Sequence, residues 1–354
     1  MNNFKNIGLI FGSTLLALIL ADLVFLMLGK APKLHSIELG NPKMAFQISD
    51  NPLLGYEHRP GYRDNNPNLI NSYESINKNG QRDRPRLLEK DKYRIILLGD
   101  SVTVGFGIKQ REMLTTQIEE KLAGKAEVLN FGMVGYNTRA EVEYLKTYGL
   151  KYSPDLVVVN YTENDGEHAA GNTSGDHRYT YQRPWWVASL LKSSSLFRYH
   201  AVRYNWYQLG AYVPGENGEN RLYNENHRLM GQNSLEDGLL LLAKIKKDHS
   251  VKILITIWPS FRKDQIIHRN TSYSPAKNLN GPLIIETLAK KYSLKTIRLA
   301  PHFRNRIGKK VQSYKKQFTI LSDTMHPNEQ GTKLGATVFA ELLRPYLANE
   351  SLLN

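Results

Sequence analysis

Apolar residues along the chain fall into three kinds of segment, and each kind predicts a different element. A continuous apolar run covers residues 7–28. Short apolar runs bounded by polar or glycine residues predict buried strands, at 95–98, 127–131, 156–161, 253–257 and 296–299. Apolar residues spaced three and four apart predict amphipathic helices, at 114–122, 139–148, 239–247, 284–291 and 334–347.

These strands and helices alternate from residue 93 onward. Alternation of this kind is typical of a parallel sheet covered by helices on both faces. The sequence therefore predicts an α/β domain over residues 93–350. The interval 166–232 interrupts the alternation of strands and helices and is too long for an ordinary connection between two of them, so we expect an insertion there. Its many aromatic residues indicate either a sugar- or lipid-contacting surface or a small satellite core.

The first apolar run predicts a transmembrane helix. Residues 7–28 would span ~33 Å as a helix, against a hydrocarbon core of roughly 30 Å. Pro32 follows the small residues Gly29 and Ala31, which disfavours cleavage there, and a chain without cysteine has no lipoprotein site. We expect residues 1–30 to be an uncleaved, single-pass anchor in the inner membrane, with the rest of the chain extracytoplasmic, in the periplasm.

Asp22 interrupts this apolar run. A carboxylate at the centre of a membrane helix costs about 2.5–3.5 kcal/mol on insertion scales, and less near the end of the helix. We interpret Asp22 as a tolerated polar residue, with a partner in the membrane as the alternative. Between the anchor and the α/β domain, residues 31–92 are rich in Asn, Pro, Gly and charge, and predict a decoration of short strands and loops.

Composition narrows the function classes. The formal net charge is +14, which favours anionic partners, and the chain has no cysteine. The densest basic stretch, 304–316, has no accompanying nucleic-acid-binding signature, so we interpret it as a solvated surface and expect no nucleic acid partner. His168 and His177 lack a metal-ligand spacing, and no phosphate or dinucleotide loop is present. We expect neither a metal nor a cofactor.

Polar and glycine residues gather where the predicted strands end. Ser101 follows the first strand, Gly135 the second, and Asn164 the third. Ligands of open parallel sheets bind beyond these carboxyl ends. Far downstream, Asp323 and His326 stand just before the last helix. A serine, a base and an orienting carboxylate suit nucleophilic acyl chemistry. The backbone N–H groups of Ser101 and Gly135 and the Asn164 amide are candidate oxyanion donors.

In these motifs the chain resembles the SGNH (GDSL) hydrolase family, over roughly residues 93–348. The matching blocks are Gly99-Asp100-Ser101, Gly132-x-x-Gly135, Glu163-Asn164-Asp165 and Asp323-x-x-His326-Pro327. The resemblance implies a flavodoxin-like three-layer α/β/α fold and cofactor-free chemistry on ester-linked acyl groups. It also implies that Ser101 is the nucleophile, His326 the base, Asp323 its orienting partner, and Gly135 and Asn164 oxyanion donors. Thr162 stands where the family has glycine, and we expect it to restrict the backbone or narrow the pocket.

Three functions remain open on the sequence. The first is a membrane-anchored serine esterase that hydrolyses acyl esters, acetyl esters among them, on an envelope glycan or lipid. The second is an O-acyltransferase that passes the acyl group to an extracytoplasmic polysaccharide. The third is a non-catalytic anchored domain that binds an anionic polymer, against which the intact Ser101, Asp323 and His326 argue.

Overall fold

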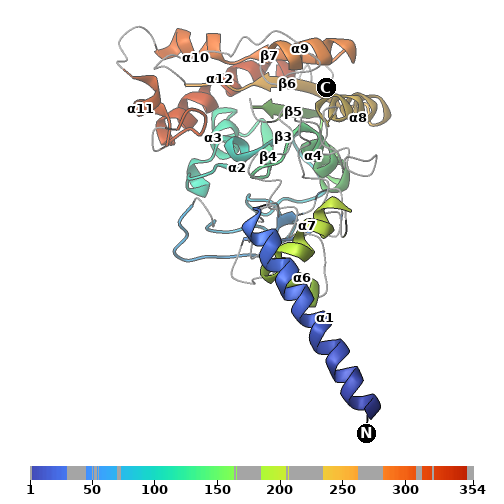
Figure 1. Cartoon of the computed structure of the whole chain (residues 1–354). Coiled ribbons are helices and arrows are strands. Elements are labelled where there is room, and N and C mark those ends of the chain that lie inside the picture. Colours follow the sequence, from blue (N-terminus) through green and yellow to red (C-terminus); the bar gives the residue numbers. More distant parts are fainter. Residues whose placement is uncertain are drawn as a thin grey trace.

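The structure is a computed structural model, and its elements are shown in Figure 1. It describes residues 2–29, 45–49, 51, 54, 56–69, 73–162, 165, 185–204, 206, 234–261, 282–307, 313–320 and 323–348. Its strands are β1 (Phe46–Ile48), β2 (Tyr56–His58), β3 (Tyr93–Gly99), β4 (Ala126–Gly132), β5 (Leu156–Tyr161), β6 (Lys252–Ile257) and β7 (Lys295–Arg298). Its helices are α1 (Asn2–Met27), α2 (Ser101–Val104), α3 (Leu114–Lys121), α4 (Thr138–Tyr144), α6 (Trp185–Ser193), α7 (Ser195–Arg203), α8 (Ser234–Asp248), α9 (Pro282–Lys291), α10 (Ala300–Ile307), α11 (Tyr314–Phe318) and α12 (Glu329–Ala348).

A five-stranded parallel sheet, counted over the described residues, forms the centre of the molecule, in the order β4-β3-β5-β6-β7. The first strand of the sheet along the chain, β3, lies between the second and the third. This is the flavodoxin-like strand order, in which the chain reverses direction across the sheet beside β3. The prediction of a three-layer, flavodoxin-like α/β fold is confirmed. Each predicted strand appears within two residues of its expected bounds.

Alternating side chains of the strands build two cores, one on each face of the sheet. Ile96 and Leu98 of β3 pack in the core beneath α4, α8 and α9. Ile95 and Leu97, the residues between, pack in the opposite core beneath α3, α10 and α12. Successive side chains of a strand point to opposite faces, so a run that is apolar throughout is covered on both. The sheet is consequently a middle layer between two layers of helices.

The central strand β5 pairs with its neighbouring strands through the backbone, and a buried amide also links it to α2 and to β6. Asn160 of β5 is paired with Gly99 of β3 on one side and with Thr256 of β6 on the other. Its side-chain Nδ2 donates to Thr103 Oγ1 at 3.2 Å, and Thr256 Oγ1 donates to Asn160 Oδ1 at 3.3 Å. Because the amide is fully buried, these bonds satisfy polar atoms that water cannot reach.

The segment between α1 and the α/β domain packs onto the domain near α2. The strands β1 and β2 pair antiparallel. Ala45, Tyr62, Tyr73 and Ile76 form a small apolar cluster together with Val104, the last residue of α2. This segment therefore contributes to the surroundings of α2, which carries Ser101.

The amino-terminal helix α1 extends away from the rest of the molecule (Figure 1). Residues Asn6–Met27 are long and apolar enough to cross a membrane, and their side chains are not buried within the protein. The helices α6 and α7 lie beside the carboxyl-terminal half of α1 (Figure 1). The interpretation of Asp22 as merely tolerated is wrong, because its Oδ1 accepts hydrogen bonds from Ser194 Oγ at 2.8 Å and from the backbone N–H of Leu196 at 2.7 Å.

Candidate active site

Ser101 is the first residue of α2, directly beyond the carboxyl end of β3. Asp100 caps this short helix, since its side chain accepts a hydrogen bond of 3.0 Å from the backbone N–H of Val102. A cap of this kind satisfies one of the N–H groups that the first turn of a helix leaves unpaired. It also fixes the backbone on both sides of Ser101, so the serine side chain leaves a defined turn.

Two glycines allow α2 to lie against the ends of β3 and β4. A Cβ atom on Gly99 would lie 2.1 Å from Thr103 Oγ1, and one on Gly132 would lie 2.2 Å from the backbone nitrogen of Val104. No side chain fits at such separations. These glycines of the first and second sequence blocks therefore bring the serine helix close to the sheet.

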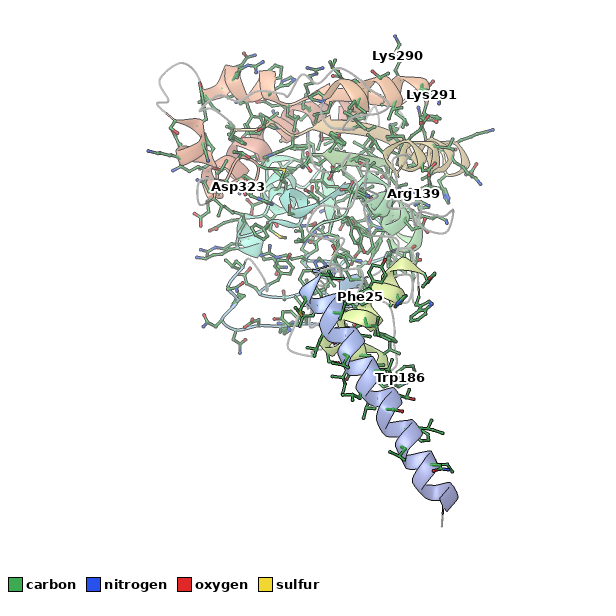
Figure 2. All side chains as sticks on the ribbon, viewed as in Figure 1. Phe25, Arg139, Trp186, Lys290, Lys291 and Asp323 are labelled. Carbon is green, nitrogen blue, oxygen red and sulfur yellow. The ribbon has the colours of Figure 1, made fainter. Side chains whose placement is uncertain are left out.

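Ser101, His326 and Asp323 form a hydrogen-bonded chain. His326 Nε2 lies 2.7 Å from Ser101 Oγ, and His326 Nδ1 lies 2.8 Å from Asp323 Oδ2. A carboxylate only accepts hydrogen bonds, so Nδ1 carries the proton in the neutral ring and Nε2 is left to accept from the serine hydroxyl. The structure thus brings together residues that are 225 positions apart in the chain. Figure 2 shows Asp323 on the side of the molecule where α2 and α11 lie.

The Asp323 carboxylate is held in place by its own backbone. Its Oδ1 accepts hydrogen bonds from the backbone N–H groups of Met325, at 2.6 Å, and of His326, at 3.1 Å. Partial burial raises the pKa of this carboxyl, but the hydrogen bonds from the His326 ring and from the two N–H groups outweigh burial and leave the pKa well below its usual range. Asp323 therefore stays ionised and keeps its orientation toward the imidazole.

The loop that carries His326 is tied to the sheet. Trp258, which follows β6, donates from its indole Nε1 to the carbonyl of Met325 at 3.1 Å. The backbone N–H of Phe261 donates to the carbonyl of Thr324 at 2.7 Å. On the other side, the Phe106 ring lies 4.6 Å from the imidazole, centroid to centroid. The imidazole is therefore positioned by contacts on more than one side.

Of the candidate oxyanion donors beyond Ser101, the structure describes Gly135 but not Asn164. Gly135 lies in the turn after β4, with φ of +76°, a conformation that glycine adopts without strain. The backbone N–H of Met133 in the same turn donates to the carbonyl of Gly99 at 3.0 Å, which keeps the turn beside the start of α2. Asn164 lies outside the described residues, as do His168 and His177.

Thr162 is turned toward the interior. It is 1% exposed, and its Oγ1 lies 2.9 Å from Asp100 Oδ2 and 3.0 Å from Asp165 Oδ1. Ser101 Oγ lies 3.3 Å from the same Asp100 Oδ2. The structure does not test the expectation that Thr162 restricts the backbone or narrows the pocket; it shows that the Thr162 hydroxyl links two carboxyl groups next to Ser101. A hydroxyl has one proton, so it can donate to only one of them at a time.

Glu141 of α4 lies behind this pair of carboxyl groups. It is fully buried, and neither of its carboxyl oxygens has a hydrogen-bond partner among the described residues. Burial, followed by the nearby charges of Asp165 and Asp100, raises the pKa of Glu141 well above its usual range. The protonated form of Glu141 is therefore favoured. Within the part of the chain that the structure describes, no set of acidic and histidine side chains is placed to hold a metal ion.

Arg82, from the segment before the α/β domain, supports the end of α2. Its guanidinium donates to the backbone carbonyls of Val104, Gly105 and Ile108 and lies 4.4 Å from the ring centroid of Tyr73. These carbonyls would otherwise be unpaired at the end of a short helix. Arg82, Phe106, Trp258 and Glu141 were not among the predicted site residues, because nothing in their sequence neighbourhood indicates that they reach the site.

Comparisons with known proteins give fold-level similarities only. No family model matches the sequence, and no curated protein matches it. Solved structures that resemble the chain include a GDSL-like lipase from Parabacteroides merdae (16% identity, 72% of this chain, 98% of that one, TM-score 0.39). They also include an esterase from a Pseudoalteromonas species (12% identity, 73% of this chain, 100% of that one, TM-score 0.39). A third is a lipase/acylhydrolase from Enterococcus faecalis (14% identity, 72% of this chain, 96% of that one, TM-score 0.39). At these identities and TM-scores, the similarities do not indicate an activity for this chain.

Proposed function

We propose that the chain is a serine hydrolase of the SGNH type that cleaves acyl esters through a covalent acyl-enzyme. The observation that carries the proposal is the continuous Ser101–His326–Asp323 hydrogen-bond chain, with both contacts under 3 Å. A serine hydroxyl is a weak nucleophile until a base accepts its proton, and the geometry supplies that base and an oriented carboxylate behind it.

In the first half of the reaction, Ser101 Oγ attacks the carbonyl carbon of the ester as its proton passes to His326 Nε2. Asp323 stabilises the resulting imidazolium through Nδ1. The tetrahedral intermediate collapses when His326 returns the proton to the alkoxide leaving group, so the alcohol departs and the acyl group stays on Ser101. In the second half, His326 takes a proton from water, the hydroxide attacks the acyl carbon, and the carboxylic acid leaves as Ser101 regains its proton.

Negative charge develops on the carbonyl oxygen in both halves. We assign its stabilisation to the backbone N–H groups of Ser101 and Gly135 and to the side-chain amide of Asn164. Support comes from the sheet pairing, which sets the turn after β4 beside the start of α2. Removal of one such donor costs about 2.7–4 kcal/mol of transition-state stabilisation in serine hydrolases.

The proposed setting is a membrane surface. Helix α1 supports a single-pass anchor, and the net charge of +14 suits a surface rich in anionic groups. We therefore place the catalytic domain on the extracytoplasmic, periplasmic side of the inner membrane, where the esters within reach are those of envelope glycans and lipids.

The test is covalent labelling with a fluorophosphonate probe, which reacts with activated serines. Wild-type protein should label, Ser101→Ala should not, and the matched control Ser193→Ala, which removes an exposed hydroxyl on α6, should label like wild type. Equal labelling of the wild type and Ser101→Ala would contradict the proposal. Product analysis with an aryl acetate should yield free acetate; transfer of the acetyl group to an added glycan in preference to water would reassign the protein to the acyltransferases.

A further inference from the structure

A cavity lies between the amino-terminal helix and the helices α6 and α7. Its volume is about 500 Å³, within the range of small-molecule sites. Most of its lining consists of apolar side chains of α1, α6 and α7, together with Trp206, which follows α7. The side chains from the helices include Leu18, Leu23, Leu190, Leu196 and Phe197. None of Ser101, Asp323 and His326 lines it, so the cavity is separate from the candidate active site.

Asp22 fixes this arrangement. Its carboxylate accepts from the backbone N–H of Leu196 and from Ser194 Oγ, at the amino-terminal end of α7. An anion at this end of a helix is favoured by the unpaired N–H groups and by the helix dipole. Asp22 is five positions from the end of the Asn6–Met27 span, about 7.5 Å along a helix. The start of α7 is therefore held at a depth where α1 would still be inside the membrane.

Helix α6 and residues just after α7 present large apolar and aromatic side chains outward. Trp186 and Leu190 of α6 are 46% and 38% exposed, and Tyr204 and Trp206 are 60% and 43% exposed. Figure 2 shows Trp186 further toward the amino terminus of α1 than Phe25. An exposed surface of this kind is unfavourable in water and marks a contact with another molecule or with a membrane.

Aromatic rings collect near the carboxyl-terminal end of α1. Phe25 lies 4.9 Å from Tyr199, His200 stacks on Tyr204 at 5.7 Å, and Phe197 lies 5.7 Å from Trp206, all between ring centroids. Tyrosine and tryptophan are enriched where a bilayer meets water, because one end of the side chain is apolar and the other polar. The cluster occupies the level on α1 where that boundary is expected.

We propose that the cavity is a lipid site, in which an acyl chain of a membrane phospholipid lies between α1 and α6–α7 and seats these helices in the bilayer interface. We infer the identity of the occupant from the residues of α1 that line the cavity. The residues of α1 that line the cavity belong to the candidate membrane span, so the molecules that reach the cavity at this depth are lipids. The inference rests on the anchor described under the proposed function, but not on the catalytic chemistry.

Tryptophan fluorescence tests the depth of the site. The full chain is placed in nanodiscs whose phospholipids carry bromine either near the glycerol or near the chain end. The chain has four tryptophans. One variant, W185F/W186F, keeps Trp206 and Trp258. The other, W185F/W186F/W206F, keeps only Trp258, which is 2% exposed in the core. We expect bromine to quench the tryptophan fluorescence of the first variant but not of the second. In the first variant, quenching should be stronger with bromine near the glycerol than with bromine near the chain end.

A phospholipid with a photoreactive acyl chain tests occupancy. Cross-links should map to the carboxyl-terminal half of α1 and to α6–α7. Leu190→Trp, which fills the cavity, should reduce these cross-links severalfold. The matched control Leu240→Trp, on the exposed face of α8 and outside the cavity, should leave them unchanged.

The outcomes separate the lipid site from the anchor. Protein that resists carbonate extraction but shows neither Trp206 quenching nor cross-links in these helices would overturn the lipid site and leave the anchor standing. Protein released by carbonate would overturn both. Because the chain has no cysteine, a single Leu23→Cys variant can form only a disulfide between copies. Efficient formation of that dimer would overturn the lipid as occupant in favour of a second copy.

Discussion

The indole Nε1 of Trp258 donates a hydrogen bond to the carbonyl oxygen of Met325, the residue immediately before His326. Trp258 follows the last residue of β6 and its ring packs edge-on against Phe303, with centroids 5.3 Å apart. A Cβ on Gly335 of α12 would lie 2.8 Å from the indole, so the ring has no room to shift toward that helix. The Trp258 indole is therefore one of the contacts through which the sheet positions the imidazole.

Trp258→Phe keeps an aromatic ring but removes this hydrogen bond. A bond of this kind contributes about 0.5–1.5 kcal/mol to stability, and small displacements of a catalytic group reduce rates strongly. We expect kcat for an aryl ester to fall roughly tenfold with KM little changed. Steady-state kinetics well below the unfolding temperature provide the check. Trp206→Phe is the matched control, and an equal loss in both variants would assign the effect to general destabilisation.

Asp323→Asn should nearly abolish turnover while leaving the fold intact. The amide is the same size as the carboxylate, but it can donate to Nδ1 and so stabilise the tautomer with the proton on Nε2. The equivalent change in serine proteases lowers kcat by about 10⁴, and we expect a loss of similar order. Pre-steady-state acylation by a chromogenic ester measures it. Asp248→Asn, at the end of α8, should behave like wild type; an Asp323→Asn enzyme that retained most of its turnover would exclude the proposed role.

Glu141→Gln should change how stability depends on pH. Burial and the neighbouring carboxyl groups raise the pKa of Glu141 in the folded protein, so the native state binds a proton that the unfolded chain, with a glutamate pKa of about 4.3, has already released. Stability is lost progressively as pH rises above this value. The variant removes that loss, so its melting temperature relative to wild type should rise between about pH 4 and pH 8.

Glu143, two residues further on α4, provides a control of opposite sign. Burial raises its pKa, but the hydrogen bonds and charges of Arg139 and Lys146 outweigh burial and lower it. Its contribution to stability is present above the unfolded pKa and is lost as pH falls. Glu143→Gln should therefore lower the melting temperature at pH 8, by an amount that shrinks below about pH 4. Parallel pH profiles for the two variants would contradict both assignments.

Arg82→Met should destabilise the protein and reduce labelling of Ser101. The methionine fills part of the space but leaves the carbonyls of Val104, Gly105 and Ile108 without their buried donor. Loss of a buried charged donor costs about 3 kcal/mol or more. Chemical denaturation measures the change. Arg84→Met is the matched control, because Arg84 is 56% exposed and its ion pair with Glu119 should contribute at most about 1 kcal/mol.

The sequence predicts the sheet well because its information is local. Each strand is a run of apolar residues with β-branched members, and such a run can be read without knowledge of the rest of the fold. Gly99, the last residue of β3, and Ser101 beyond it also lie where the pattern places them. The helices α10 and α11 were not predicted, because each has few apolar residues among basic and polar ones and shows no clear apolar spacing.

The surroundings of the site are less predictable because they depend on distant segments. Arg82 is one arginine among many in a polar stretch, and only the fold shows that it reaches the end of α2. Glu141 and Glu143 lie two positions apart on one helix, and the sequence does not tell which is buried without a partner. Asp22 and Ser194 are 172 positions apart, so their contact carries no local signal.

Val157, Val158 and Val159 make β5 uniform in side-chain type, although its two faces lie in different cores. A shift of this strand by one residue would replace valine with valine at its centre, so these residues say little about which alignment is right. Asn160 removes the ambiguity, because its amide finds Thr103 and Thr256 in only one alignment. Since β5 separates β3, which leads to Ser101, from β6, which leads to Trp258, this single amide sets the distance between Ser101 and the loop that carries His326.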